Sequence, residues 1–234
     1  MGVDAVRSVI FDIDGTLYDY DAAHAHAISA LETYFCAEYG LTPEAFKALH
    51  RQAEAVMRAR AGAWSAAIHN RLLRYQVMLE LLGRPIAGAP VLEALYWQTL
   101  LLWMKPYPGL HAALDAIRDM GMRIGVGTNM TADWQYEKLR TLKVLDRIDF
   151  IVTSEEAGCE KPDRRLFDLC AEKAGCAASD CVFVGDSLKG DVAGALNAGM
   201  RAIWFDPAGR AAQPPEGALR IASFDELPMR LASL

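Results

Sequence analysis

The 234-residue chain is longer than a typical single domain, and its 53% hydrophobic content is enough for a buried core. Its net charge of −6 argues against non-specific nucleic-acid binding, and no apolar stretch approaches the roughly 18–20 residues that cross a membrane. Five cysteines without a CxxC pair and an N-terminus without a hydrophobic leader predict a cytoplasmic protein with reduced thiols.

The first predicted element is a strand that ends in two acids. Its β-branched and aromatic residues lead directly into Asp12, and Asp14 follows one residue later. Gly15 permits the sharp turn that ends this run. Two carboxylates are thereby placed at the carboxyl end of a strand, where open α/β sheets bind their ligands.

Residues 20–104 contain no convincing strand and predict helices. Apolar residues at helical spacing indicate helices over about 24–39, 43–60, 64–82 and 90–104, with short connections at glycines and prolines. Four antiparallel helices of this kind predict a small bundle.

From residue 110 onward, helices and strands alternate. We predict strands at 123–128, 150–152, 181–184 and 201–205, with helices at 110–120, 131–142, 163–174 and 191–198. Residues 213–217 are expected to form a surface loop, followed by a short amphipathic segment. Such alternation indicates an α/β fold with a doubly wound parallel sheet. The first strand belongs to this sheet, so we expect a core domain of residues 1–17 and 107–234 and an inserted helical domain of residues 18–106.

Polar residues follow two further strands in this half of the chain, which makes three strands with the one that ends at Asp12. Thr128 ends one strand, Lys161 stands at a helix entrance, and Asp186 and Asp191 follow another strand. If the strands are neighbours, four carboxylates, one hydroxyl and one ammonium group meet at one sheet edge. This inventory suits Mg²⁺ and a phosphoryl group.

Four segments of the chain resemble the four motifs of the haloacid dehalogenase-like (HAD) hydrolases. They are the run from Asp12 to Thr16, Thr128, Lys161-Pro162, and Gly185-Asp186 with Asp191. The motifs occur in the family's order and span most of the chain. The resemblance implies a HAD-like Rossmannoid core and makes the helical insertion a type 1 cap. It also implies a Mg²⁺-dependent phosphatase that acts on a small phosphorylated metabolite.

On the matching positions, the resemblance implies that Asp12 is the nucleophile and forms an aspartyl phosphate. Asp14 would protonate the leaving group and later activate water. Mg²⁺ would be bound by Asp12, by the backbone carbonyl of Asp14 and by Asp186, with Asp191 as a direct or water-mediated ligand.

The same resemblance assigns the remaining positions to the phosphoryl group. Thr128 would donate its hydroxyl to a phosphoryl oxygen, and the backbone amides of Gly15 and Asn129 would do the same. Lys161 would neutralise phosphoryl charge and orient the nucleophile.

Other activities stay open at this point. A phosphomutase uses the same acids, whereas 2-haloacid dehalogenases of this family lack the second acid, which is present here as Asp14. A receiver-like signalling domain is the non-enzymatic alternative, although receivers are about half this length. A monomer and a homodimer are both compatible with the sequence.

Substrate selection is expected in the cap and at its two crossings, where Arg71 and Arg74 lie three residues apart and so share one helix face. Such a face is a candidate site for a second anionic group of the substrate. Met130 is a further candidate for the pocket lining. The full set of candidate cap contacts is Tyr18, His24, Arg58, Arg60, Trp64, His69, Arg71 and Arg74.

Overall fold

The computed structural model describes residues 6–62 and 65–234. The chain forms two compact units, one of residues 1–19 and 105–234 and the other of residues 20–104. The first unit is an α/β domain and the second is helical. Their boundaries lie two residues from those expected from the sequence, because Tyr18 and Pro106 form a β-bridge inside the first unit.

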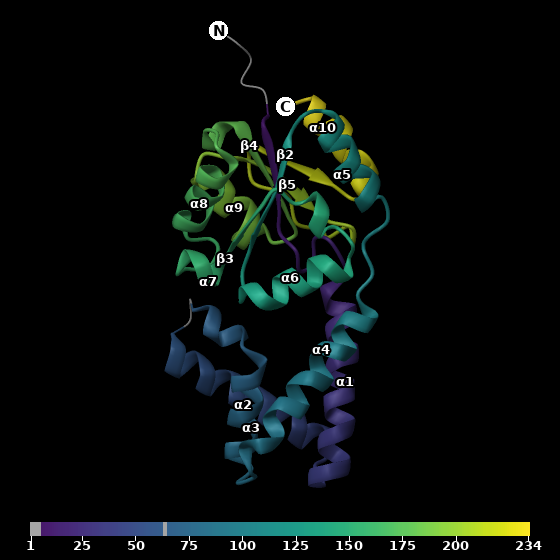
Figure 1. Ribbon diagram of the computed structural model, residues 1–234, viewed down its shortest axis with the longest axis vertical. Helices are drawn as coiled ribbons and strands as arrows, with labels where there is room; N and C mark the ends of the chain where they lie inside the picture. Colours follow the sequence, from purple (N-terminus) through teal and green to yellow (C-terminus); the bar gives the residue numbers. More distant parts are fainter. Residues whose placement is uncertain (1–5, 63–64) are drawn as a thin grey trace. The chain divides into compact units, whose positions relative to one another are not determined.

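The α/β unit is built on one parallel sheet (Figure 1). Its strand order is β3-β2-β1-β4-β5-β6, so the N-terminal strand lies between two strands that follow much later in the chain. The register pairs Phe11 with Val126 on one side and with Val184 on the other. The strands are β1 (Ser8–Phe11), β2 (Arg123–Thr128), β3 (Phe150–Thr153), β4 (Cys181–Gly185), β5 (Arg201–Phe205) and β6 (Ala218–Ile221).

Helices cover both faces of this sheet, as expected for right-handed parallel connections. Figure 1 shows α8 and α9 on one face and α5 and α10 on the other. The doubly wound α/β fold predicted from the sequence is confirmed. The α-helices of this unit are α5 (Leu110–Asp119), α6 (Ala132–Thr141), α7 (Ser154–Ala157), α8 (Arg164–Ala174), α9 (Ala193–Asn197) and α10 (Leu227–Ala232).

Short helical turns complete the α/β unit, and one of them changes the expected helix after β4. The predicted helix over 191–198 begins instead as a π-helical turn, η5 (Leu188–Val192), so Asp191 lies inside that turn. The other turns are 3₁₀ helices: η3 (Leu145–Arg147), η4 (Ala178–Asp180) and η6 (Phe224–Glu226).

The sheet contains one strand that the sequence did not predict. β6 forms an edge of the sheet and pairs with β5 from Ala202↔Ala218 to Phe205↔Ile221. Three of its four residues are only partly buried. A short, half-exposed strand after a loop rich in proline and glycine has a weak alternation, so the sequence predicts only the loop at 213–217 and an amphipathic ending after Phe224, and no element between them.

The helical unit contains α1 (Tyr20–Tyr39), α2 (Pro43–Ala61), α3 (Arg71–Leu81) and α4 (Ala89–Trp103), with 3₁₀ turns η1 (Ala66–His69) and η2 (Ile86–Gly88). Helix α1 packs against α4, and α3 packs against both α2 and α4. Within the described residues, no helix combines the length and hydropathy that crossing a bilayer requires.

The third predicted helix, 64–82, differs from the observed structure. It is a 3₁₀ turn followed by α3, because Asn70 interrupts the helix and its side chain accepts a hydrogen bond from the backbone of Leu73. Asparagine is a strong N-cap residue, and here it outweighs the apolar periodicity that runs through it. Trp64, a candidate cap contact, lies outside the described residues.

The two chain segments that lead to and from the helical unit lie side by side within the α/β unit. Tyr18 and Pro106 form an antiparallel bridge, and the backbone amide of Tyr107 donates to the carbonyl of Leu17 at 2.9 Å. The insertion therefore starts and ends at one neck, formed by residues 17–18 and 106–107.

Close packing at Gly194 gives a test of this fold. A Cβ at this position in α9 would lie 2.5 Å from the ring of the fully buried Phe167 and 3.2 Å from the Cα of Pro162. Helix propensity alone predicts that Gly194→Ala stabilises the protein by up to about 1 kcal/mol. We expect the cost of overpacking to exceed this gain in helix propensity, so that the free energy of unfolding measured in urea falls by about 1–3 kcal/mol. Gly88→Ala is the control, because a Cβ there meets nothing closer than 3.5 Å. An increase in stability for Gly194→Ala contradicts this packing.

Candidate functional site

The sheet topology brings residues from distant parts of the sequence to one edge. Asp12 follows β1, Thr128 ends β2 and Asp186 follows β4. These three strands are parallel neighbours, so their carboxyl ends lie together. The backbone amide of Asp12 donates to the carbonyl of Val184 at 3.0 Å, which extends the pairing of β1 and β4 up to the first acid.

A buried lysine holds two of the acids. The Nζ of Lys161 lies 2.8 Å from Oδ1 of Asp12 and 2.7 Å from Oδ1 of Asp191, and it donates to the carbonyl of Gly127 at 3.1 Å. Lys161 is 6% exposed, Asp12 7% and Asp191 1%. One ammonium group therefore neutralises part of the charge of two carboxylates that are almost entirely out of water.

Asp186 joins these two acids in a three-carboxylate cluster. Carboxylate oxygens of Asp12, Asp186 and Asp191 all lie within 4.8 Å of one another. The absence of a side chain at Gly15, whose φ is +82°, makes room for this arrangement, because a Cβ there would lie 2.8 Å from the Cγ of Asp186. Both the turn and the close approach require glycine at this position.

The backbone of Asp186 is held by three hydrogen bonds. Its amide donates to the hydroxyl of the buried Thr16 at 3.1 Å. Its carbonyl accepts from the indole of Trp204 at 2.9 Å and from Arg210 at 3.0 Å. The position of this acid is therefore fixed by the sheet and its loops rather than by its own carboxylate.

The electrostatics show that three acids are too many for one lysine. Burial raises the pKa of Asp186 to about 7, and the charges of Asp12 and Asp191 add to the rise. Burial also raises the pKa of Asp12, and the Lys161 ammonium only partly opposes it. The pKa of Lys161 is itself raised, because the attraction of both carboxylates outweighs the effect of burial. A further cation at this point would stabilise the charged form of all three acids.

The carboxylate of Asp14 has partners other than those of the three-carboxylate cluster. Its carboxylate accepts hydrogen bonds from Nζ of Lys138 at 2.7 and 2.6 Å and from the hydroxyl of Tyr18 at 2.5 Å. Lys138 and Tyr18 are both completely buried. Lys138 was not predicted as a site residue. Tyr18 is a predicted candidate for substrate contact, and in the structure its hydroxyl is a partner of Asp14.

The side chain of Gln135, which the sequence did not predict as a site residue, holds both Thr128 and Asn129. The Nε2 of Gln135 donates to the hydroxyl of Thr128 at 2.7 Å and to the carbonyl of Asn129 at 2.9 Å. The side-chain oxygen of Asn129 accepts from the backbone amide of Lys161 at 2.9 Å. The loop after β2 is thereby linked to α6 and to the lysine loop.

Met130 adopts a backbone conformation that is unusual for a residue with a side chain. Its φ is +123°, and it is 4% exposed. Its amide donates to the hydroxyl of Ser154 at 2.8 Å, and its sulfur accepts from Nζ of Lys138 at 3.5 Å. Strained residues of this kind persist only where surrounding contacts hold them, and they concentrate at functional sites.

The candidate cap contacts are mostly engaged within the helical unit. Nδ1 of His24 is hydrogen-bonded to the hydroxyl of Tyr96 at 2.8 Å. Arg58 pairs with Glu54 at 3.0 Å and Arg60 with Glu80 at 3.6 Å, all on partly exposed surfaces. Arg71 and Arg74 are buried rather than displayed on a solvated face, and the backbone carbonyl of His69 accepts from Arg71.

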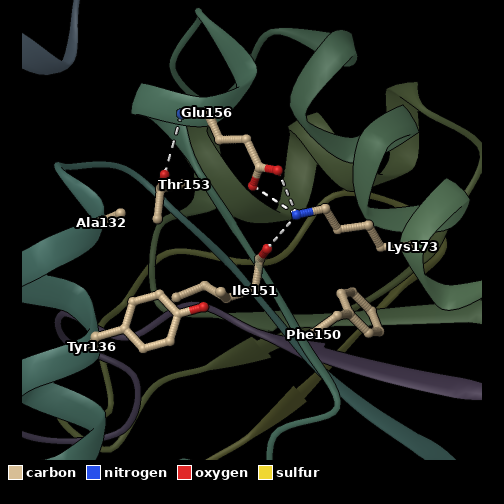
Figure 2. Close-up of a pocket in the computed structure, with 7 residues that line it drawn as sticks. All are labelled: Ala132, Tyr136, Phe150, Ile151, Thr153, Glu156 and Lys173. Atoms are coloured by element: carbon tan, nitrogen blue, oxygen red, sulfur yellow. Dashed lines mark hydrogen bonds and ion pairs between the residues drawn. The ribbon is translucent and has the colours of Figure 1, made fainter.

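A separate hollow of about 400 Å³ lies beside the edge strand β3 (Figure 2). Nζ of Lys173 lies 2.6 and 2.7 Å from the two carboxylate oxygens of Glu156 and donates to the carbonyl of Ile151 at 2.9 Å. The charges of Lys173 and Glu156 therefore neutralise each other, and the hollow does not include the acidic cluster. The lining residues are Ala132, Tyr136, Phe150, Ile151, Thr153, Glu156 and Lys173.

The sequence matches the haloacid dehalogenase-like hydrolases over residues 6–199. This chain belongs to that family. The HAD-like hydrolase is 35% identical over 203 residues to ribulose-1,5-bisphosphate 5-phosphatase of Halopiger xanaduensis, which covers 86% of this chain and 84% of the relative. It is 31% identical over 202 residues to glyceraldehyde 3-phosphate phosphatase of Methanopyrus kandleri, covering 83% and 82% of the two chains.

Among solved structures, the HAD-like hydrolase resembles a 2-haloacid dehalogenase from Pseudomonas syringae. The TM-score is 0.78 at 28% identity, over 97% of this chain and 99% of the other. The family predicted from the four motifs is confirmed. The family assignment also favours the hydrolase over the receiver-like alternative.

The buried Lys138–Asp14 pair gives a test of the site's geometry. Asp14→Asn leaves the ammonium of Lys138 buried without its anion, so we expect a loss of about 3 kcal/mol in the free energy of unfolding. Adding Lys138→Met removes that stranded charge, and the double variant should recover most of the loss. Asp12→Asn is the comparison, and its loss of stability should be smaller, because Lys161 retains Asp191 as a partner. Urea denaturation of the four proteins measures this, and equal losses in the single and double Asp14 variants contradict the ion pair.

Proposed function

We propose that this protein is a Mg²⁺-dependent phosphatase that hydrolyses a small phosphorylated metabolite through an aspartyl phosphate on Asp12. The observation that carries the proposal is the placement of Asp12. Its carboxylate stands at the carboxyl end of the central strand β1, paired with Lys161 and within reach of the cluster acids. Four acids, one threonine and one lysine at one sheet edge match the requirements of phosphoryl transfer.

The donor set fits a hard divalent cation. Asp12, Asp186 and Asp191 offer carboxylate oxygens within 4.8 Å of one another, and burial together with the charges of Asp12 and Asp191 raises the pKa of Asp186 despite the opposing charge of Lys161. We assign these three residues, with the backbone carbonyl of Asp14, as the groups that would hold Mg²⁺. When bound, Mg²⁺ would neutralise charge on the phosphoryl oxygens.

The chemistry proposed for the chain's own residues has two steps. In the first, with Asp14 in its protonated form, an Asp12 carboxylate oxygen attacks phosphorus, the bond from phosphorus to the leaving oxygen breaks, and Asp14 gives that oxygen its proton. In the second, water attacks phosphorus, the bond to Asp12 breaks, and Asp14 takes a proton from the water. Lys138 and Tyr18 hold the carboxyl group of Asp14 in place for both transfers.

The remaining site residues are assigned to the phosphoryl group. We propose that the hydroxyl of Thr128 and the backbone amides of Gly15 and Asn129 donate to its oxygens, while Lys161 offsets its charge. Gln135 is a positioning residue in this scheme, because it acts on the substrate only through Thr128 and Asn129.

Small phosphorylated metabolites are the proposed substrate class. Two relatives named as phosphatases of a sugar bisphosphate and a triose phosphate support it, because each matches more than four-fifths of this chain. The five cysteines are free, which fits a reducing compartment, and we infer a cytoplasmic location.

The resemblance to a 2-haloacid dehalogenase does not change the proposed reaction. A halide leaves without a proton, so that chemistry has no use for the second acid. In this chain Asp14 is present and is held by two buried side chains. Dehalogenation of 2-chloropropionate is the corresponding negative control in any assay.

The direct test is hydrolysis of a phosphometabolite panel with and without Mg²⁺, including ribulose 1,5-bisphosphate and glyceraldehyde 3-phosphate. We expect phosphate release that EDTA abolishes and added Mg²⁺ restores. Asp12→Asn should retain the fold and lose more than about 99% of kcat, because its amide is a far poorer nucleophile than the carboxylate. Activity of this variant above about 1% of wild type rules out Asp12 as the nucleophile.

A second test separates the two acids of the first motif. Asp14→Asn should slow phosphorylation by alkyl phosphates far more than by p-nitrophenyl phosphate, because nitrophenolate leaves with little need for a proton. Rapid-quench bursts below the unfolding temperature of the variant isolate this step from hydrolysis of the aspartyl phosphate. Equal slowing for both substrates excludes Asp14 as the general acid.

A further inference from the structure

Two arginines are buried inside the helical unit. Arg71 and Arg74 lie three residues apart on α3, and 6% of each is exposed. The guanidinium of Arg71 lies over the ring of Tyr96 at 5.0 Å and near that of Trp97 at 6.0 Å. Arginine is rarely buried unless an anion neutralises its charge, so the burial of both Arg71 and Arg74 is unusual.

Neither guanidinium has a carboxylate within 4.0 Å in the described part of the chain. Arg71 donates to the carbonyl of His69 at 3.1 Å and, at 3.3 and 3.4 Å, to the hydroxyls of Tyr20 and Tyr96. These acceptors are neutral. The interactions with the aromatic rings offset part of the charge but provide no counter-ion.

Arg74 has still fewer partners. It donates to the carbonyl of Ile68 at 2.9 Å. Glu54 is the acid whose charge reaches Arg74, but its carboxylate is paired with Arg58 at 3.0 Å and remains at the surface. A guanidinium carries five N–H donors, so most of the hydrogen-bonding capacity of Arg74 is unused by the residues described.

Unused polar atoms gather around the two arginines. Within the described residues, the buried Nε atoms of Arg71 and Arg74, the Tyr75 hydroxyl and Nε2 of His50 have no hydrogen-bond partner. We call these four residues the arginine cluster. Burial and the two arginine charges lower the pKa of His50 to about 4, so this histidine is neutral near pH 7. The cluster therefore carries two positive charges with no anion beside them.

We propose that the arginine cluster binds an oxyanion, the phosphate or carboxylate group of a small molecule, inside the helical unit. The planar fork of arginine matches these groups and pairs with them through two parallel hydrogen bonds. An anion would supply the charge that the two guanidinium groups lack and would accept from their Nε atoms and from Tyr75. Burying two like charges side by side is costly unless such a partner is present.

The anion has two sources with the same chemistry. It is either a second anionic group of the substrate, in which case the cluster selects doubly anionic substrates, or a separate ligand such as inorganic phosphate. The first source rests on the proposed phosphatase function. Binding of an oxyanion to the metal-free protein does not depend on that function. The oxyanion site and the phosphatase function can therefore be refuted separately.

Titration of the full-length protein with inorganic phosphate tests the site itself. In EDTA, calorimetry of the wild type should show saturable binding, and phosphate should raise its unfolding temperature above that in chloride of equal ionic strength. Arg71→Gln and Arg74→Gln should each weaken binding at least about tenfold, and Arg74→Lys should fall between. Arg51→Gln, which removes the same charge from the exposed face of α2, is the matched control and should bind as the wild type does.

The outcomes of this titration are distinct. In chloride, Arg74→Gln should be at least as stable as the wild type, because it lacks an unpaired buried cation. In phosphate, the wild type should be the more stable of the two. No saturable binding by the wild type overturns the proposal without any variant. Equal affinity in all of the proteins, or destabilisation by Arg74→Gln that is the same in both buffers, also overturns it and makes the arginines packing residues.

A matched pair of substrates distinguishes the two sources. Ribulose 1,5-bisphosphate and ribulose 5-phosphate differ by one phosphate. If the cluster holds the second group, Arg74→Gln should raise KM for the bisphosphate at least about tenfold and leave ribulose 5-phosphate nearly unchanged. If the ligand is separate, both substrates should respond alike to the variant and to added phosphate. Failure of both substrates to turn over in the wild type counts against the proposed function, while the phosphate titration still decides the site.

Discussion

The site depends on the ammonium of Lys161 lying between Asp12 and Asp191. Three carboxylates at one sheet edge repel one another, and two of them are nearly removed from water. Lys161 lets two of these acids remain close together while leaving a surplus of negative charge around Asp186. A divalent cation would offset that surplus, and so the imbalance of charge suits the site to a cation and, through it, to the proposed phosphoryl chemistry.

The parallel sheet is what makes this arrangement possible. Because β1 lies between β2 and β4, loops that are far apart in sequence emerge next to one another. Positions there are set by contacts with the sheet and the flanking helices: Gln135 on α6 fixes Thr128, Asn129 fixes Lys161, and Trp204 on β5 fixes Asp186. The groups proposed to react can therefore be held in precise positions while lying at a sheet edge rather than deep in the core.

The sequence predicted the residues of the candidate site that follow strands, but not the residues that support them. Asp12, Thr128 and Asp186 could be found because each follows an apolar run at a strand end. Lys138 and Gln135 lie on α6, where polar residues at helical spacing indicate a solvated face, and no local signal marks them as completely buried. Their burial arises from the tertiary packing of α6, and it places their polar ends against Asp14 and Thr128. The break at Asn70 does have a local signal, its N-capping side chain, but the apolar periodicity that continues through it predicts one unbroken helix.

The neck at residues 17–18 and 106–107 has a consequence for how the chain folds. Forming the Tyr18–Pro106 bridge closes a loop of about 90 residues, but loop-closure entropy grows only with the logarithm of length, about 0.6 kcal/mol per doubling. The inserted residues also form their own compact helical unit, with helices joined by short connections. Local helical contacts form quickly, so we expect the insertion to collapse early and to shorten the effective separation between the two ends of the neck. The core sheet can then tolerate inserted helices of very different length, because the insertion constrains the strands only through the positions at which the chain leaves and returns.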